Sequence, residues 1–203
     1  TVSMPIIQLG LTPVYVDVDR NSLNIDTESV KAAINDKTKI LMPVHTLGLP
    51  ADMEDIMNIA NDYDLIVLED CCEAHGASIN DKYIGSWGHI STFSFFVAHN
   101  MTTGEGGMIL TNDEDLYVKC QSMREFGRYK DITKNSEMYY TDEILKDYDK
   151  RYVFSEIGYN MRMTDISAAL GIEQTKKLDA MNQLRIRNAE YLRENFIENF
   201  SKY

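Results

Sequence analysis

The residues best suited to chemistry lie in one stretch of the sequence, 91–107. The stretch begins with apolar, β-branched and aromatic residues, a composition typical of a buried strand. It ends in a glycine-rich turn, where the backbone can adopt positive φ and approach a ligand closely. A hydroxyl, Ser94, and an imidazole, His99, lie between these two parts. Histidine has an unperturbed pKa of about 6.5, so His99 is a candidate base at neutral pH.

A candidate partner acid, Asp70, follows a nearly continuous apolar run at 65–68. Such a run is typical of a parallel strand covered on both faces, and ligands of α/β sheets gather at the carboxyl ends of the strands. A carboxylate at that depth is costly unless it has a partner. Two interpretations of Asp70 stand: a helix cap or turn residue, which is the commoner role of Asp, or an acid that pairs with a protonated ring nitrogen.

The other signals also have ordinary interpretations. Taken alone, His99 is typical of a hydrogen-bonded loop or core histidine, and Ser94 of a small polar filler in a strand. The 104–107 turn matches neither common phosphate-binding fingerprint. No pair of cysteines has zinc or iron–sulfur spacing, and the remaining histidines are scattered, so we expect no metal site. Those histidines are His45, His75 and His89.

The elements that must position these residues alternate between strands and helices. We expect strands over 13–18, 39–44, 65–70, 91–97 and 108–111, and helices over 1–9, 27–35, 52–63, 113–123, 164–178 and from 180 onward. Asp52 and Asn112 are the expected caps of two of these helices. The alternation predicts an α/β fold with a mostly parallel sheet flanked by helices. Residues 127–151 are polar and lack apolar periodicity, which predicts a long loop.

Composition excludes several classes of partner. The chain has 203 residues and a net charge of −12, which argues against nucleic acid or an anionic membrane surface as its main partner. No apolar run approaches the roughly 20 residues of a membrane span, and we identify no signal peptide. Cys71, Cys72 and Cys120 indicate no disulfide framework. We therefore expect a reduced, cytoplasmic location.

Several motifs, in order along nearly the whole chain, resemble the DegT-type sugar aminotransferase family of fold-type-I pyridoxal phosphate (PLP) proteins. They are LEDCCEAHGA at 68–77, GSWG at 85–88, TFSFF at 92–96, TTGEGGM at 102–108 and GYNMRMTD at 158–165. The resemblance implies the large PLP-binding domain of the aspartate-aminotransferase-like fold. It also implies that the chain is incomplete at both ends, with residues 1–178 as part of that domain and 179–203 as a helix leading to an absent small domain.

The resemblance also implies roles for individual residues. Asp70 is similar to the acid that pairs with the pyridine nitrogen and makes the ring an electron sink. Ser94 resembles the serine that holds the phosphate. Glu73 lies where many relatives have a glutamine that hydrogen-bonds the ring hydroxyl, and an ionised glutamate can only accept. Asn160 resembles the residue that reaches the phosphate of the neighbouring subunit's cofactor, which implies a homodimer with shared active sites.

His99 departs from the aminotransferase pattern, because it stands where relatives carry the lysine that binds the cofactor covalently. In this respect the chain is similar to the sugar 3-dehydratase branch of the family. That resemblance implies that pyridoxamine phosphate (PMP) reacts with a nucleotide-linked 4-keto-6-deoxyhexose, that His99 removes a proton from the cofactor, and that the C3 hydroxyl leaves as water. Glutamate would then restore the amino group of the cofactor.

Two alternatives remain open from the sequence. One is a nucleotide-sugar transaminase in which histidine replaces the lysine. The other is a catalytically silent fragment that keeps the fold and binds no cofactor. The sequence does not identify the nucleotide of the substrate.

Overall fold

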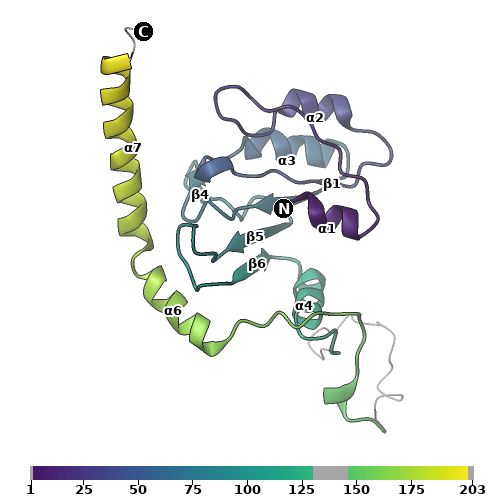
Figure 1. The fold of residues 1–203 in the computed structure, drawn as a ribbon. Coiled ribbons are helices and arrows are strands. Elements are labelled where there is room, and N and C mark those ends of the chain that lie inside the picture. Colours follow the sequence, from purple (N-terminus) through teal and green to yellow (C-terminus); the bar gives the residue numbers. More distant parts are fainter. Residues whose placement is uncertain (1, 130–145, 201–203) are drawn as a thin grey trace.

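The computed structural model describes residues 2–129 and 146–200, and its centre is a four-stranded sheet (Figure 1). The strand order is β1 (Ile40–Leu41), β2 (Ile66–Asp70), β5 (Ile90–Ser94) and β6 (Gly107–Thr111). β1, β2 and β5 are parallel, and β6 runs antiparallel to β5. The predicted α/β class with a mostly parallel sheet is therefore confirmed.

The core lies between the sheet and the helices drawn above it in Figure 1, α2 (Thr27–Ala33) and α3 (Met53–Asp62). The apolar stripe of α3 buries Met53, Ile56 and Ile59 against a cluster that includes Val67 of β2. These positions recur at the spacing of one helix face. Val67 is 0 % exposed, as expected for a central parallel strand. This packing makes β2 a rigid support for the residues at its end.

Side-chain caps define where the helices begin. Asp52 accepts from the Asp55 amide at 3.1 Å and starts α3 as predicted. Asn112 was the predicted cap of α4 (Glu114–Met123), and that prediction is wrong by one residue. Asp113 is the cap, because its carboxylate accepts from the Leu116 amide at 2.8 Å. Thr164 caps α6 (Asp165–Thr175) in the same manner.

Two predicted strands differ in the structure. Residues 13–18 form no strand, and only an isolated bridge pairs Val18 with Ile25. No neighbouring strand completes a ladder there among the described residues, so the apolar alternation has no hydrogen-bonded partner. The strand predicted over 39–44 is reduced to β1 and a separate bridge of Val44 with Asp70, because Pro43 has no N–H to donate.

A short hairpin was not predicted. β3 (Ser78–Ile79) and β4 (Lys82–Tyr83) pair antiparallel across Asn80 and Asp81. Both turn residues have positive φ, 48° and 62°, as a two-residue hairpin turn of type I′ requires. Asn and Asp tolerate that conformation better than most residues, so the Asn-Asp pair was the available sequence signal.

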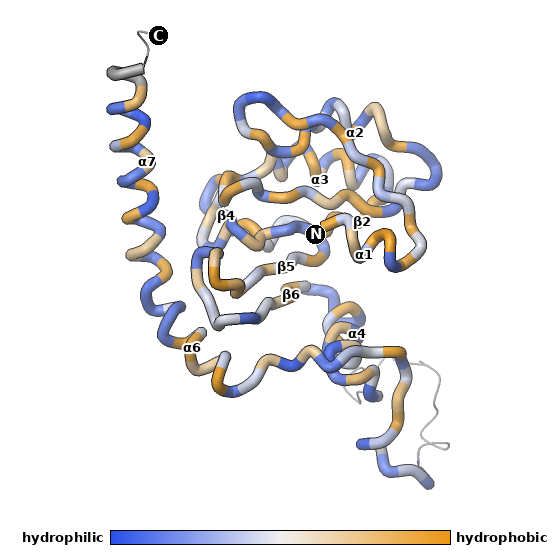
Figure 2. The backbone as a smooth tube through the Cα atoms, viewed as in Figure 1, coloured by the Kyte–Doolittle hydropathy of each residue, from blue (hydrophilic) through white to orange (hydrophobic). Residues whose placement is uncertain are grey.

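The ends of the described chain are helical. α1 (Ser3–Gln8) stops before Gly10, which has φ 72° and serves as the predicted left-handed stop. α7 (Leu178–Phe200) runs from α6 along one side of the sheet and away from it (Figure 1). Hydrophilic and hydrophobic residues alternate along α7 in Figure 2, and Leu184 and Phe196 are exposed. No helix in the described ranges has the length and apolarity needed to cross a membrane.

The predicted 127–151 loop lies largely outside the described residues, which leave out 130–145. Its described beginning, 127–129, pairs with the segment 153–155. Arg128 bridges Phe154, and the amide of Tyr129 donates to the Val153 carbonyl at 2.9 Å. The 3₁₀ turn η2 (Lys150–Tyr152) precedes that segment.

Candidate active site

Asp70 ends β2 and is held through its backbone. Its amide donates to the Pro43 carbonyl at 2.9 Å, and its own carbonyl accepts from the His45 amide at 3.1 Å. The carboxylate is half-buried, and its Oδ1 accepts from the Cys72 amide at 3.0 Å. Burial, followed by the hydrogen bond with Asp70, raises the pKa of the Cys72 thiol to about 12. The thiol beside Asp70 is therefore neutral, and the local negative charge belongs to the carboxylate.

The structure brings Glu73 and His99 together. Glu73 Oε1 lies 4.0 Å from His99 Nε2, while Glu73 Oε2 accepts from the Leu47 amide at 3.0 Å. A turn holds His99, since its amide donates to the Phe96 carbonyl at 3.0 Å and its ring meets the Phe96 ring edge-on. His99 Nδ1 is buried and has no hydrogen-bond partner in the described part of the chain. One imidazole nitrogen thus faces a carboxylate and the other is unpaired.

Ser94 lies at the end of β5, on the same edge of the sheet as Asp70. Asp70 pairs in register with Thr92, so the parallel strands β2 and β5 end side by side. Ser94 is half-buried, and its hydroxyl accepts from the Phe96 amide at 3.2 Å. This arrangement matches the rule that ligand-binding groups gather at the carboxyl ends of parallel strands.

Asn160 belongs to the segment between η2 and α6. It forms an isolated bridge with Glu125, next to the end of α4, and it is exposed. The neighbouring Met161 amide donates to the Arg124 carbonyl at 3.0 Å. The site residues predicted from sequence therefore fall into one group of Asp70, Glu73, Ser94 and His99 around the ends of β2 and β5, with Asn160 on a separate segment.

The sequence analysis did not place His75 near the candidate site, but the structure does. The side chain is 6 % exposed, and neither ring nitrogen has a hydrogen-bond partner among the described residues. The ring meets Phe93 edge-on at 5.2 Å between centroids. Burial lowers the pKa of His75 and outweighs the opposing effect of the neighbouring Asn100 side chain, and the nearby His99 adds to the lowering. The signal in the sequence was a histidine within the motif that carries Asp70.

The start of α7 was also missed as a neighbour of the site. Asn182 Nδ2 donates to the His75 carbonyl at 2.8 Å. The side-chain amide of Asn100 pairs at both its nitrogen and its oxygen in one of its two orientations. In that orientation the nitrogen donates to the Glu73 carbonyl at 2.8 Å, and the oxygen accepts from Arg185 at 3.1 Å. The contacts of Asn182 with His75 and of Arg185 with Asn100 join residues more than 80 positions apart, so no local pattern in the sequence predicts them.

Comparisons with known proteins find extensive similarity. The family model described as the DegT/DnrJ/EryC1/StrS aminotransferase family matches residues 1–202. The chain is 40% identical over 197 residues to GDP-4-keto-6-deoxy-D-mannose 3-dehydratase of Escherichia coli O55:H7, covering 97% of this chain and 50% of that protein. It is 39% identical over 170 residues to GDP-perosamine synthase of Escherichia coli O157:H7, covering 84% of this chain and 42% of the relative.

A solved structure is similarly close. It is the E. coli GDP-4-keto-6-deoxy-D-mannose-3-dehydratase with bound hydrated PLP. The two structures match with a TM-score of 0.86 and 38% sequence identity, and the match covers 97% of this chain and 50% of the dehydratase chain. The chain thus spans about half the length of the curated relatives it matches. Relatives with different names, a dehydratase and a synthase, match at nearly equal identity.

Proposed function

Because the chain belongs to the DegT/DnrJ/EryC1/StrS aminotransferase family, we propose that it serves the C3 dehydration of a nucleotide-linked 4-keto-6-deoxyhexose. The reaction uses PLP and PMP as cofactor forms and glutamate as amino donor. The observation that supports this proposal is His99: its imidazole faces Glu73, at the position where the family resemblance implies a cofactor-binding lysine. An imidazole can carry a proton but cannot hold the cofactor covalently.

The chemistry of the donor set fits the cofactor. The Asp70 carboxylate suits the cationic pyridine nitrogen, and the Ser94 hydroxyl suits a phosphate oxygen. Glu73 is acceptor-only when ionised, so it suits a hydroxyl that donates. His99 Nδ1 is a buried polar atom without a partner in the described chain, which fits a position that a ligand group completes.

When bound, the cofactor supplies an electron sink for a bond broken next to the sugar carbonyl carbon. The protein's own side chains hold and transfer the protons. The Asp70 carboxylate would pair with the ring nitrogen of the cofactor and would keep a proton on it. The His99 imidazole would accept the proton released from the cofactor and would deliver it to the departing C3 hydroxyl, which leaves as water, so one residue would serve as base and then as acid. The Glu73 carboxylate stabilises the imidazolium between these two events.

A second candidate is a nucleotide-sugar aminotransferase. Its support is the similarity to a GDP-perosamine synthase at 39% identity. In that case the acceptor is again a 4-keto sugar, and the amino group is transferred to it. A third possibility is a catalytically silent scaffold, which predicts that the complete protein binds no PMP.

The remaining features of the proposal concern assembly and location. We propose a homodimer in which the exposed Asn160 reaches the cofactor phosphate of the partner subunit. We also propose that residues 1–178 belong to the cofactor-binding domain and that 179–203 lead toward a small domain, consistent with α7 beginning at Leu178. A cytoplasmic reaction agrees with the free thiols of Cys71, Cys72 and Cys120.

The test is product analysis by mass spectrometry with a panel of nucleotide-linked 4-keto sugars, PLP and glutamate. The complete protein should yield a 3-deoxy sugar, and its His99→Lys variant should bind PLP covalently, in a form that borohydride traps. His99→Asn is the matched control, which should lose dehydration without gaining the covalent link. An amino sugar from the unsubstituted protein would instead support the aminotransferase candidate.

A further inference from the structure

Glu69 is a carboxylate enclosed in the fold, with 0 % exposure, on β2. Its Oε1 accepts from the amides of Trp87 at 2.9 Å and Gly88 at 2.6 Å. Its Oε2 accepts from the Gly85 amide at 2.8 Å and pairs with His45 Nε2 at 3.2 Å. Burial acts to raise the pKa of Glu69, but the hydrogen bonds from His45, Gly88 and Gly85 outweigh it and hold the pKa below its ordinary value. The buried group is therefore an anion with its acceptor positions filled.

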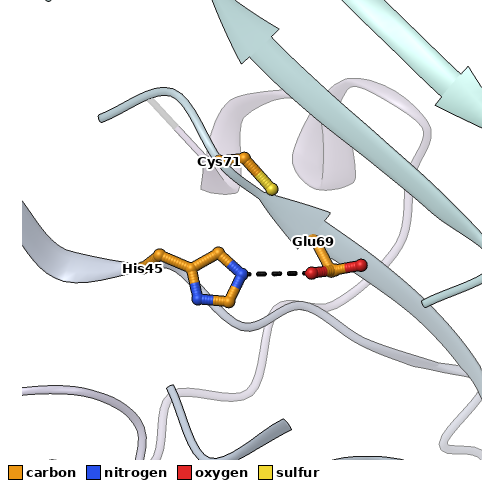
Figure 3. A group of neighbouring side chains, drawn as sticks. All are labelled: His45, Glu69 and Cys71. Carbon is orange, nitrogen blue, oxygen red and sulfur yellow. Dashed lines mark hydrogen bonds and ion pairs between the residues drawn. The ribbon is translucent and has the colours of Figure 1, made fainter. Parts of the chain in front are cut away.

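His45 completes the arrangement from the neighbouring segment. The ring points at Glu69, with the Cys71 sulfur beside it (Figure 3). His45 Nδ1 accepts from the Ala51 amide at 3.0 Å, so the ring proton lies on Nε2, where it is donated to Glu69. The His45 side chain is 0 % exposed. A neutral imidazole in this tautomer has both nitrogens satisfied.

A metal site is the competing interpretation, because ligand atoms of His45, Glu69 and Cys71 lie within 4.8 Å of one another. The hydrogen bonds argue against it, since both imidazole nitrogens and both carboxylate oxygens already have partners. Burial, followed by the charge of Glu69, raises the pKa of the Cys71 thiol, which therefore stays protonated, whereas metals bind the thiolate. The cluster is a hydrogen-bonded pair with a neutral thiol beside it.

The pair is connected directly to Asp70. Glu69 and Asp70 are consecutive in a strand, so their side chains point to opposite faces of the sheet. His45 binds both residues, because its ring meets the Glu69 carboxylate and its amide donates to the Asp70 carbonyl. Pro43 lies on the same segment as His45, and its carbonyl accepts from the Asp70 amide. Anchoring Glu69 on one face therefore restrains Asp70 on the other.

The same segment also reaches Glu73. Two residues beyond His45, the Leu47 amide donates to Glu73 Oε2 at 3.0 Å. Leu47 has φ 53° and its side chain is exposed, a conformation that a leucine keeps only where its surroundings impose it. The segment 43–47 thus carries the contacts that hold two of the proposed site residues, and His45 fastens it to the core.

We infer that Glu69 and His45 are positioning residues of the proposed active site. Their buried hydrogen bond fixes the segment 43–47, and through that segment it places Asp70 and Glu73 for the cofactor. The inference rests on the proposed function. It assigns these two residues a role in placing the site as well as in stabilising the fold. Separate measurements of cofactor affinity and of thermal stability can distinguish the two roles.

The experiment compares His45→Gln with His45→Asn in the complete protein. Glutamine carries its amide near the Nε2 position and keeps a donor for Glu69, whereas asparagine carries its amide near Nδ1 and loses that donor. We expect His45→Gln to bind PMP, measured by fluorescence titration, within about threefold of the unsubstituted protein. His45→Asn should bind it at least about tenfold more weakly, since it removes the side-chain donor to Glu69. Glu69→Gln should have a similar effect, since an amide NH2 replaces one of the two carboxylate oxygens that accept hydrogen bonds.

Val67→Ala is the matched control, because Val67 is equally buried on β2 but has an apolar side chain. It should lower the Tm and leave PMP affinity within about threefold. If His45→Asn and Val67→Ala lower the Tm equally and neither changes PMP affinity, Glu69 and His45 are only structural and the inference is overturned.

Amide exchange separates this inference from the proposed function. In the apo protein, Glu69→Gln should speed exchange at the amides of Asp70 and Leu47, and Val67→Ala should not do so to the same extent. Failure of the unsubstituted protein to bind PMP would refute the proposed function. Unchanged exchange at Asp70 and Leu47 in Glu69→Gln would refute the positioning role, whatever the cofactor result.

Discussion

Glu73 Oε1 lies 4.0 Å from His99 Nε2, although 26 positions of the sequence separate the two residues. The Glu73 carboxylate is steadied from its other oxygen by the Leu47 amide. The pair is partly exposed, with side-chain exposures of 20 % for His99 and 44 % for Glu73, so solvent screens the attraction. The Glu73 carboxylate thus faces the ring nitrogen that we propose as the proton donor to a leaving hydroxyl.

The first prediction concerns this pair. Glu73→Gln should slow dehydration by up to about fivefold, because a screened ion pair contributes about 1 kcal/mol or less. Single-turnover formation of the 3-deoxy product measures the effect. Glu28→Gln, an exposed acid on α2, is the control and should leave the rate unchanged. A Glu73→Gln enzyme with the full rate would contradict a role for the carboxylate at His99.

The second prediction concerns Asp70. Asp70→Asn keeps an oxygen for the Cys72 amide but removes the charge that suits the pyridine nitrogen. PMP affinity should fall by about tenfold or more, as expected for loss of a charge-assisted pair. Because Asp70 contributes to the raised pKa of the Cys72 thiol, the variant should also alkylate faster at Cys72 in mildly alkaline buffer. Peptide mapping of the labelled apo protein tests this second effect without cofactor.

The third prediction is a pH dependence of stability from His75. Burial lowers the pKa of His75 from its ordinary 6.5, so folding disfavours the protonated ring. The neutral ring's contribution is complete above about pH 6.5 and is lost as the pH falls through the lower pKa of the folded state. Urea unfolding between about pH 7.5 and 5.5 should therefore show falling stability, and His75→Gln should flatten that slope. An equal slope in the variant would rule His75 out as the source.

The fourth prediction distinguishes the observed cap of α4 from the expected one. Asp113→Ala should lower the free energy of unfolding by about 1 kcal/mol, because the Leu116 amide loses its acceptor. Asn112→Ala should stay within about 0.5 kcal/mol of the unsubstituted protein. Urea titration of both variants at one pH measures the difference. The reverse order of stabilities would restore the cap predicted from sequence.

Local patterns in the sequence were sufficient for much of the fold. The apolar run before Asp70 predicted β2, which the structure confirms. The expected cover on both faces is wrong for the described residues, because Ile66 is exposed while Val67 is buried. The spacing of Met53, Ile56 and Ala60 predicted α3, because a helix with one buried face must repeat apolar residues at that interval. The strand predicted from the alternation at 13–18 is wrong. A strand also needs a neighbouring strand to pair with, and the residues 13–18 themselves do not determine whether one is present.

The candidate site divides in the same way. Asp70, Ser94 and His99 were predicted as site residues from residue type, from position at strand ends and from motifs that resemble the family, all of which can be read from the sequence. Tertiary structure decided that Glu73 faces His99, because that contact depends on how two loops close across the sheet edge. It also decided that His45, far from β2 in sequence, donates to Glu69. A residue's type determines which hydrogen bonds it can make, but only the packed chain determines which donor and acceptor meet.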